Sequence, residues 1–333
     1  MSASVRAQII GTGSALPDRV VTNADLETIV DTSDEWITTR TGIRERRIAA
    51  SDEYLSQYAS RAAAMALERA EMEASQVDLI LCATVTPDMV TPATACFIQQ
   101  DLGAVNAAGF DLSAGCSGFL YALATGQTFI EAGKARTVMV IGGEILSRFI
   151  NWEDRSTCVI FADGAGAVLL RGGTGERGIL ASRMHSDGAM ADFITIAGGG
   201  SRYPSTPERL KDKVNTIRMK GNETFKVAVR SIEEVSREVL REAGLSPDDV
   251  DLFVPHQANQ RIIDAVGQRL GIPGERCYVN IERTGNTSAA SIPIALHEVA
   301  DSGRLRPDNH VLMAAFGAGL TWAGSVVRWG RDA

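Results

Sequence analysis

The sequence predicts an α/β protein built from two similar halves, residues 1–175 and 176–333. Strand-like and helix-like segments alternate along the chain, which is typical of sheets covered by helices on both faces. The same order recurs at a period near 170 residues, so that Asp78-Leu-Ile-Leu81 falls opposite Asp251-Leu-Phe-Val254 and Val138-Met-Val140 falls opposite Val311-Leu-Met313. A chain of 333 residues is long enough for one such duplicated domain.

In the first half, residues 8–11 are expected to form a strand that ends in a turn at Thr12-Gly-Ser14. Asn23 is expected to cap a short helix, and the arginine-rich segment 31–47, which includes Arg46, is expected at the surface. The later elements follow from apolar runs and periodicity: strands at 77–85, 108–112, 137–141 and two within 158–170, and helices at 53–70, 93–102 and 116–132.

The second half repeats this alternation. Residues 197–213, with three glycines and two prolines, are expected to form a surface loop. By the repeat, Ala83 matches His256 and Cys116 matches Asn286, which would bring these strand ends together. The expected elements are helices at 221–243, 258–270 and 287–300, and strands at 250–254, 277–281, 310–314 and 321–329.

Composition narrows the class of protein. A net charge of −8 and a pI of about 5.2 exclude a general attraction to nucleic acid. No apolar run reaches the roughly 20 residues of a membrane helix, and the first six residues do not form an apolar signal segment. The five cysteines contain no Cys-x-x-Cys pair, so we expect no metal site and a reduced, cytoplasmic chain.

Cys116 stands where strand 108–112 breaks at Ser113-Ala-Gly115 and a largely apolar helix begins. A helix that is apolar almost all round belongs in a core. Free N–H groups and the macrodipole at its N-terminus favour an anion, which would lower the pKa of the thiol and activate it. Taken alone, the segment fits a buried structural cysteine equally well.

Three further features accompany Cys116. His256 lies where a strand meets a helix, Asn286 lies among small residues, and Phe316-Gly-Ala-Gly-Leu320 forms a glycine-flanked turn that can present N–H groups to an oxyanion. Cysteine, histidine and asparagine together indicate acyl transfer through a thioester. Both a papain-like hydrolase and a condensing enzyme use that set.

The order of motifs decides between these two enzymes. From residue 10 onward the whole chain resembles β-ketoacyl-[acyl carrier protein] synthase III, the initiating condensing enzyme of type II fatty-acid synthesis. The resemblance implies the thiolase fold, two α/β halves in five layers (αβαβα), and a homodimer. The matching segments are Ile10-Gly-Thr-Gly13, Asp31-Thr-Ser-Asp-Glu-Trp-Ile37, Arg40-Thr-Gly-Ile-Arg-Glu-Arg46, Ala114-Gly-Cys-Ser-Gly-Phe119, Phe161-Ala-Asp-Gly-Ala-Gly166, Gly221-Asn-Glu-Thr-Phe-Lys226, Val254-Pro-His-Gln-Ala-Asn259 and Gly285-Asn-Thr-Ser-Ala-Ala290.

The same resemblance implies roles for the central residues. Cys116 would accept an acyl group from acyl-CoA, and the backbone N–H groups of Cys116 and Ala318 would form the oxyanion hole. His256 and Asn286 would hold the thioester of malonyl-[acyl carrier protein] and stabilise the enolate formed on loss of carbon dioxide, giving a 3-oxoacyl-[acyl carrier protein]. Family members often have glycine at the position of Ala318. No cofactor or metal is implied.

The resemblance also implies three sets of residues outside the catalytic centre. Thr91 stands where acetyl-selective relatives have a phenylalanine that closes the partner subunit's acyl pocket, so a longer primer is expected. The expected CoA contacts are Thr32, Trp36, Arg40, Arg155, Gly221 and Asn259. The expected carrier-protein contacts are Lys226, Gln257, Ala258, Asn259, Gln260, Arg261 and Arg269.

Four other functions use a similar fold or a similar set of residues. A thiolase-fold synthase that makes a secondary metabolite from CoA substrates keeps the fold and changes the product. A cysteine hydrolase is disfavoured by the Gly221 to Lys226 motif, and a thiolase that needs a second late cysteine is disfavoured because the last one is Cys277. A catalytically inactive scaffold is disfavoured because Cys116, His256 and Asn286 all occur together.

Overall fold

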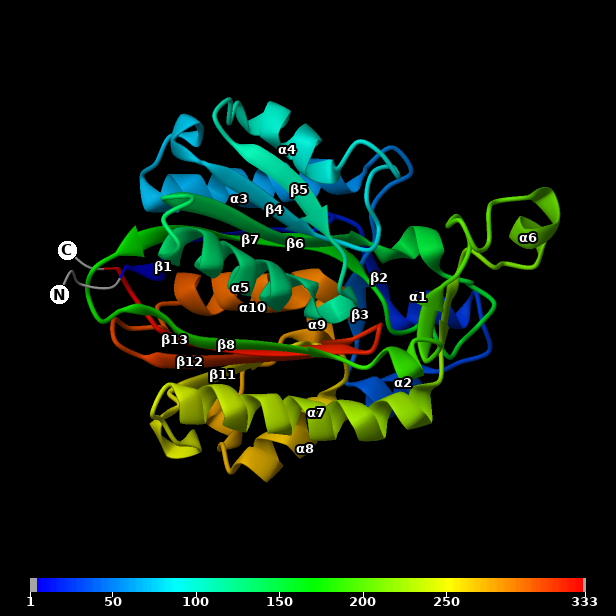
Figure 1. Ribbon diagram of the computed structural model, residues 1–333. Helices are drawn as coiled ribbons and strands as arrows, with labels where there is room; N and C mark the ends of the chain where they lie inside the picture. The colour runs from blue at the N-terminus through cyan, green and yellow to red at the C-terminus, as the bar shows by residue number, and fades with distance from the viewer. Residues whose placement is uncertain (1–4, 332–333) are drawn as a thin grey trace.

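A computed structural model describes residues 5–331 and has five layers, with helices outside and between two sheets (Figure 1). The first sheet has the strand order β1 (Arg6–Ala15), β7 (Asp163–Gly173), β6 (Thr137–Ile145), β4 (Leu79–Ala83) and β5 (Ala108–Leu112). The second has the order β8 (Gly178–Ser186), β13 (Thr321–Arg328), β12 (His310–Gly317) and β11 (Leu252–Pro255). The predicted αβαβα arrangement is confirmed.

The helices divide into three layers. The central pair, α5 (Gly118–Glu131) and α10 (Ser291–Asp301), lies between the sheets in one apolar core that draws on both of them (Figure 1). A helix in that position meets apolar surface on both sides, which explains why the α5 sequence is apolar almost all round. The outer pairs are α3 (Leu55–Ala70) with α4 (Thr94–Leu102), and α7 (Gly221–Glu242) with α8 (Gln260–Leu270).

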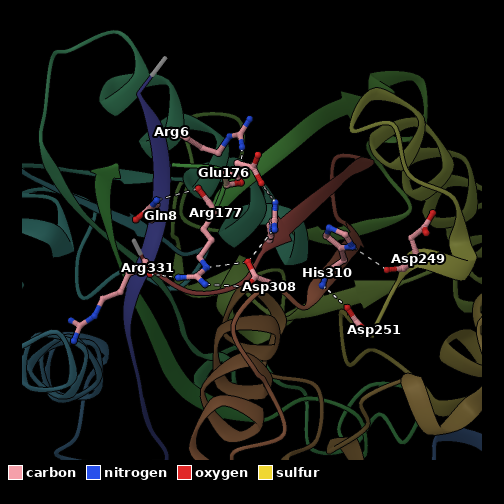
Figure 2. A network of polar contacts seen from close by, with 10 residues as sticks. Arg6, Gln8, Glu176, Arg177, Asp249, Asp251, Asp308, His310 and Arg331 are labelled. Carbon is pink, nitrogen blue, oxygen red and sulfur yellow. Dashed lines mark hydrogen bonds and ion pairs between the residues drawn. The ribbon is translucent and has the colours of Figure 1, made fainter. Parts of the chain in front are cut away.

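The duplication is visible in element positions and in contacts. β4 and β11, β6 and β12, and α5 and α10 each begin 173 residues apart (Leu79 and Leu252, Thr137 and His310, Gly118 and Ser291). Asp78 accepts from the Thr137 N–H at 3.0 Å, and Asp251 accepts from the His310 N–H at 2.8 Å, as Figure 2 shows for the second pair. An isolated parallel bridge from Phe253 to Cys277 takes the place of β5. The predicted boundary at residue 175 stays a prediction, because both sheets share the central core.

β1 is longer than expected, because its glycines serve packing rather than a turn. The strand continues through Thr12, Gly13 and Ser14 to Ala15. A Cβ on Gly11 would lie 2.1 Å from the carbonyl oxygen of Ala66, and one on Gly13 would lie 2.0 Å from that of Ala62. The two glycines therefore let the strand approach α3 closely, and the predicted turn is wrong.

Two other predicted strand assignments are wrong. Residues 158–170 do not form two strands: turns cover Cys158, and a single strand β7 begins at Asp163. Residues 277–281 contribute only the bridge at Cys277, and Ile281 begins the short helix α9 (Ile281–Thr284). Glycines explain the first error, since a Cβ on Gly166 would lie 2.6 Å from the backbone nitrogen of Ile294 on the central helix.

The arginine-rich segment is partly buried, contrary to expectation. It contains α2 (Asp34–Thr41) and β3 (Glu45–Arg47), which pairs with β2 (Val20–Thr22). Arg46 is fully buried, and its guanidinium donates to the Val21 carbonyl at 3.1 Å, to Asn23 Oδ1 at 2.9 Å and to the Val159 carbonyl at 2.9 Å. Those acceptors explain how a charged side chain is tolerated there.

The cap of the first helix is also shifted from its predicted place. Thr22 caps α1 (Asn23–Glu27), and Asp25 completes a capping box with it. Asn23 is the first helical residue and buries its side chain, which donates to the Ile43 carbonyl at 2.8 Å. The sequence prediction that Asn23 is the cap is therefore wrong by one residue.

Residues 187–220 lie outside the five layers and project from one end of the sheets (Figure 1). They contain β9 (Ile194–Ile196), which pairs with β10 (Ile217–Met219), and the projecting helix α6 (Pro207–Lys211). The predicted loop at 197–213 is thus a loop with one short helix in it. No helix within residues 5–331 combines the length and apolar character that crossing a lipid bilayer requires.

A polar network joins the sheets at the end where the termini lie (Figures 1 and 2). Arg177 and Arg328 both bind the carboxylate of Asp308 at 3.1 Å, and Arg328 also pairs with Glu176 at 2.5 Å. Arg6 donates to the Glu176 carbonyl at 2.7 Å. These groups are largely solvated, so each pair stabilises the fold by roughly 0–1 kcal/mol.

Candidate functional site

A cavity of about 570 Å³ opens between the two halves and contains Cys116. Cys116, Ser288 and Ala318 line one part of it, and the rest of the wall is largely apolar. That wall consists chiefly of Val85, Pro87, Met89, Val90, Leu146, Phe149, Phe161, Ile194, Ile196 and Ile217. A thiol at the end of an apolar cavity of this size is suited to receiving a hydrocarbon chain.

Glycines bring two backbone segments together beside Cys116, which lies in the 3₁₀ turn Gly115–Ser117 before α5. A Cβ on Gly115 would lie 2.7 Å from the Ala318 nitrogen, and one on Gly317 would lie 2.4 Å from the Cys116 nitrogen. The backbone N–H groups of Cys116 and Ala318 are therefore close together, as the predicted oxyanion hole requires. Ala318 is not among the non-glycine residues with positive φ within residues 5–331, so alanine fits there without strain.

Burial raises the pKa of the Cys116 thiol to about 11, which is opposite to the direction expected from the sequence. The nearby Glu144 carboxylate also raises this pKa, and a hydrogen bond from Ser288 lowers it in part. The loss of solvation outweighs the hydrogen bonds that lower this pKa. Cys116 therefore rests as a thiol and needs a proton acceptor when it reacts.

His256 directly follows β11 and is 2 % exposed. Its Nδ1 lies 2.6 Å from the Ser291 hydroxyl, whose oxygen also accepts from the Gln257 N–H at 3.3 Å. Burial lowers the pKa of His256 to about 3, so the ring is neutral at ordinary pH. With its hydroxyl proton directed to Nδ1, Ser291 selects the tautomer that carries a proton on Nε2, and His256 is suited to donate rather than to act as a charged acid.

Asn286 is held through both its backbone and its side chain. Its N–H donates to the Ile160 carbonyl at 3.0 Å, and its carbonyl accepts from Ala162 at 2.9 Å. Its Oδ1 accepts from the Ser288 N–H at 2.8 Å, which leaves the amide N–H groups to donate to a ligand.

The three predicted catalytic residues converge on the segment that leads into α10. Ser288 contacts Asn286 and lines the cavity together with Cys116, and Ser291 contacts His256. His256 and Asn286 are not themselves among the residues that line the cavity. The predicted match of Ala83 with His256 has the observed offset of 173. The predicted match of Cys116 with Asn286 is wrong by three residues, because Cys116 precedes α5 by two residues and Asn286 precedes α10 by five.

Three predicted CoA contacts gather around the Trp36 ring on α2. The guanidinium carbons of Arg40 and Arg155 lie 4.9 and 5.2 Å from the Trp36 ring centroid. Arg155 also donates to the Asp31 carbonyl at 3.0 Å. A flat aromatic ring of a ligand can take the place of a guanidinium over the indole, or it can stack between the indole and a guanidinium.

The other predicted CoA contacts border this cluster. Asn259 caps α8 and donates to the Arg40 carbonyl at 2.9 Å, which ties α8 to α2. The Thr32 hydroxyl is buried and has no hydrogen-bond partner among residues 5–331. Gly221 begins α7 and is exposed.

The predicted carrier-protein contacts do not all reach the surface. Lys226, Arg261 and Arg269 are exposed on the outer helices of the second half, and Arg269 pairs with Glu233 at 3.2 Å. Ala258 and Gln260 are half-buried. Gln257 does not fit a surface role: it is fully buried, and its side-chain amide binds the backbone of Pro255, Tyr278 and Asn280.

Thr91 lies in the exposed loop between β4 and α4, beside the cavity rather than in its wall. Its neighbours Met89 and Val90 do line the cavity, and Val90 is 93 % exposed in the single chain. The role of Thr91 toward a partner's pocket stays a prediction.

Three residues with direct contacts to the site were missed in the sequence: Ser288, Ser291 and the buried Glu144. The two serines lie in a run of small residues, and nothing in their sequence context distinguishes them. Glu144 does carry a signal, because it is the single charged residue in the otherwise apolar β6. Within residues 5–331, no cluster of three or more His, Cys, Asp or Glu side chains is arranged to hold a metal ion.

Comparison with known proteins adds an independent line of argument. The chain matches the family described as 3-oxoacyl-[acyl-carrier-protein (ACP)] synthase III over residues 110–188, and the C-terminal family of that name over residues 240–329. It is 50 % identical over 331 residues to β-ketoacyl-[acyl-carrier-protein] synthase III of Caldanaerobacter subterraneus subsp. tengcongensis, covering 99 % of this chain and 100 % of that one.

Solved structures agree with these matches. The 3-oxoacyl-[acyl-carrier-protein] synthase III of Aquifex aeolicus has a TM-score of 0.91 at 51 % identity, covering 97 % of this chain and 100 % of that one. The priming β-ketosynthase of the R1128 polyketide biosynthetic pathway has a TM-score of 0.91 at 36 % identity, covering 100 % and 99 %. Similarity of this extent means that the chain belongs to the 3-oxoacyl-[acyl-carrier-protein] synthase III family, the condensing enzymes that initiate fatty-acid synthesis.

Proposed function

We propose that the protein condenses an acyl-CoA primer with malonyl-[acyl carrier protein] and releases a 3-oxoacyl-[acyl carrier protein]. The observation that supports this proposal is a thiol, Cys116, in the wall of an apolar cavity with the backbone N–H groups of Cys116 and Ala318 beside it. His256 and Asn286 are held by Ser291 and Ser288 of the neighbouring segment. A nucleophile, an oxyanion site and two neutral donors are the parts that a decarboxylative condensation needs.

The reaction proceeds in two stages. Cys116 sulfur attacks the acyl-CoA thioester, the tetrahedral oxyanion binds the two backbone N–H groups, and CoA leaves as its thiolate and takes a proton from solvent. Malonyl-[acyl carrier protein] then loses carbon dioxide, and its enolate oxygen accepts hydrogen bonds from His256 and Asn286. The enolate carbon attacks the acyl-cysteine and expels the Cys116 sulfur.

Neutral donors suit the decarboxylation step. The low pKa of His256 keeps the ring uncharged, so it does not form an ion pair with the malonyl carboxylate that must depart as carbon dioxide. The fixed amide of Asn286 adds a second donor with no charge. Both groups therefore favour the charge that develops on the thioester oxygen.

The surroundings supply a site for each substrate. The Trp36, Arg40 and Arg155 cluster would stack on the CoA adenine, and Thr32, Gly221 and Asn259 would border the nucleotide and pantetheine. Lys226, Arg261 and Arg269 would receive the acidic carrier protein. The chemistry assigned here uses no cofactor or metal.

The proposed assembly is a homodimer in the cytoplasm. β5 is the outer strand of its sheet and exposes Phe110, and Val90 and Val105 are exposed nearby in sequence. An unpaired edge with apolar side chains is suited to pairing with a second copy. The thiol that the reaction needs is preserved in a reducing compartment, and all five cysteines are free.

A second function has one specific observation in its favour. The R1128 priming β-ketosynthase shares the fold over the full chain at 36 % identity, and Thr91 is smaller than the phenylalanine of acetyl-selective enzymes. A synthase that primes a secondary metabolite with a longer acyl group would have the same catalytic residues. Its carrier protein and primer would differ.

One experiment tests the proposal and separates the two functions. The protein is incubated with a panel of acyl-CoAs and malonyl-[acyl carrier protein], and products are identified by mass, with Cys116→Ala as the control. We expect one acyl group on Cys116 and a 3-oxoacyl carrier product, both absent in the variant. Acylation that persists in Cys116→Ala would overturn the site. Products formed only with a polyketide carrier protein would favour the second function.

A further inference from the structure

Glu144 is a buried carboxylate that the proposed reaction does not use. It lies at the end of β6, is fully buried and receives hydrogen bonds only from neutral donors. Its Oε2 accepts from the hydroxyl groups of Thr84 at 3.1 Å and Thr86 at 2.6 Å, and from the Val85 N–H at 3.1 Å. Its Oε1 accepts from the Ser288 hydroxyl at 3.2 Å. Burial without a cation raises its pKa to about 7, so both protonation states are accessible.

Ser288 connects this carboxylate to the nucleophile. Its hydroxyl donates to Glu144 Oε1 at 3.2 Å, its turn packs against the 3₁₀ turn that carries Cys116, and both Ser288 and Cys116 line the cavity. Ser288 also lowers the pKa of the Cys116 thiol, as a hydroxyl beside the sulfur does. Because the Ser288 proton is directed to Glu144, the Ser288 oxygen is free to accept the proton of the thiol. This arrangement provides a path for a proton from the sulfur through one hydroxyl to the carboxylate.

The backbone conformation of Ser288 indicates that its side chain has a function. Its φ is +50°, a left-handed conformation that favours glycine. The residue 173 positions earlier, Gly115, has nearly the same φ of +54° and is a glycine. The second half thus keeps a hydroxymethyl group at a position where the first half uses the unstrained residue, as expected when that group has a function.

The reaction needs a proton acceptor that the other residues do not provide. Cys116 rests as a thiol because burial raises its pKa to about 11. His256 is an unfavourable base because its pKa is lowered to about 3 and its Nδ1 is occupied by Ser291. Glu144 is the buried group that reaches the thiol through a single hydroxyl.

We propose that Ser288 and Glu144 form a proton relay that removes the Cys116 proton during acyl transfer and returns it after condensation. The proposal rests on the proposed function. As the sulfur bonds to the acyl carbon, its proton passes to the Ser288 oxygen and the Ser288 proton passes to Glu144 Oε1, leaving a neutral carboxylic acid. When condensation expels the Cys116 thiolate, the same two transfers run in reverse and restore thiol and carboxylate. CoA thiolate is protonated by solvent, so the cycle balances.

The test follows the pH dependence of single-turnover acylation, read by intact-protein mass from about pH 5.5 to 9. The native rate should rise through about pH 7, because Glu144 accepts a proton only when it is ionised. The other titratable groups that interact with Glu144 are the thiols of Cys82 and Cys116, and burial keeps both protonated through this range. In Glu144→Gln this rise should disappear, and the rate at pH 7 should fall by roughly 10²-fold, as loss of a proton acceptor predicts.

Two further variants separate a relay from a structural role. Ser288→Ala keeps the carboxylate and removes the link, so it should lose the same pH-dependent rise. Asp163→Asn neutralises another buried carboxylate, one that binds Ala49 and Ser147 and does not contact Cys116. This matched control should keep the native pH profile. Glu144→Asp should recover part of the lost rate if an ionisable group is what matters.

Several outcomes would overturn the relay. Native acylation rates and an unchanged pH profile in folded Glu144→Gln or Ser288→Ala would do so, as would an equal loss in Asp163→Asn. Release of carbon dioxide from malonyl-[acyl carrier protein] should persist in Glu144→Gln, which separates the relay from general damage. If Cys116 itself were not acylated in the native protein, the proposed function would fail, whereas acylation that ignores Glu144 would refute the relay alone.

Discussion

The two halves have the same backbone conformation at a matched position beside the cavity, but they carry different side chains there. Positions 173 apart in the chain carry Gly115 and Ser288, with φ of +54° and +50°. In the first half, Gly118 packs its backbone against Ala83, since an added Cβ would lie 3.2 Å from the Ala83 Cβ. In the second half, the matching pair is Ser291 and His256, joined by a 2.6 Å hydrogen bond.

The difference agrees with the proposal that one duplicated scaffold supports two chemical steps. Around Cys116 small residues are required, because Gly115 and Gly317 let the segment 317–318 reach the thiol closely enough to form an oxyanion site. Around His256 and Asn286 the matching positions are filled with polar groups that fix two donors. In the proposed reaction, Cys116 of the first half serves acyl transfer, and His256 and Asn286 of the second half serve decarboxylation.

The largest test of this division is the loss of the two donors. His256→Ala and Asn286→Ala should each still be acylated at Cys116, since neither side chain contacts the acyl-transfer site. Release of carbon dioxide from malonyl-[acyl carrier protein] should fall by roughly 10²–10³-fold per donor removed. Intact-protein mass measures the first step and carbon dioxide release measures the second. Lost acylation with retained decarboxylation would reverse the roles of the halves.

A second test adds a side chain at one left-handed position and removes it at the other. Gly115→Ala should destabilise the fold by about 1–3 kcal/mol, because it adds strain at φ +54° and places a Cβ 2.7 Å from the Ala318 nitrogen. Ser288→Gly should relieve about 1 kcal/mol of strain and offset part of its lost hydrogen bond to Glu144. Chemical denaturation measures both. If Ser288→Gly destabilised the fold as much as Gly115→Ala, the backbone strain at the two turns would not be equivalent.

The duplicated architecture could be predicted from the sequence, since the alternation of elements and the Asp78 and Asp251 repeat survive in the structure. Three features could not. The identity between the halves is too thin to fix the register near Asn286, where the predicted match is wrong by three residues. Glycines at 11 and 13 resemble a turn but serve close packing. The pKa of Cys116 depends on burial created by the whole fold, so its direction was predicted wrongly from the local helix alone.

The outer helices extend the comparison to partner recognition. Arg261 on α8 is exposed and lies 5.5 Å from the Phe225 ring on α7, whereas its neighbour Arg269 is already paired with Glu233. Arg261→Glu should raise the KM for malonyl-[acyl carrier protein] by roughly 10-fold or more and leave acylation nearly unchanged.

Steady-state kinetics at several salt concentrations measures the Arg261 effect, which should shrink as salt screens it. Arg269→Glu is the matched control and should have a smaller effect, because its positive charge is partly neutralised by Glu233. An equal loss of acylation in Arg261→Glu would point to damage in the fold instead.

The smallest expected effect concerns the loops that follow matched strands. Residues 84–93 connect β4 to α4, whereas residues 256–259 suffice between β11 and α8, so the first half has extra chain at the cavity. That chain supplies Met89, Val90 and the exposed Thr91. If Thr91 leaves room in a partner's pocket, each additional methylene of primer contributes about 0.8 kcal/mol, or roughly fourfold in kcat/KM. Thr91→Phe should therefore lower kcat/KM for butyryl-, isobutyryl- and octanoyl-CoA relative to acetyl-CoA. A strong acetyl preference in the native protein that Thr91→Phe leaves unmoved would mean that Met89 or Val90 fills the space, and that the longer loop closes the pocket without setting primer length.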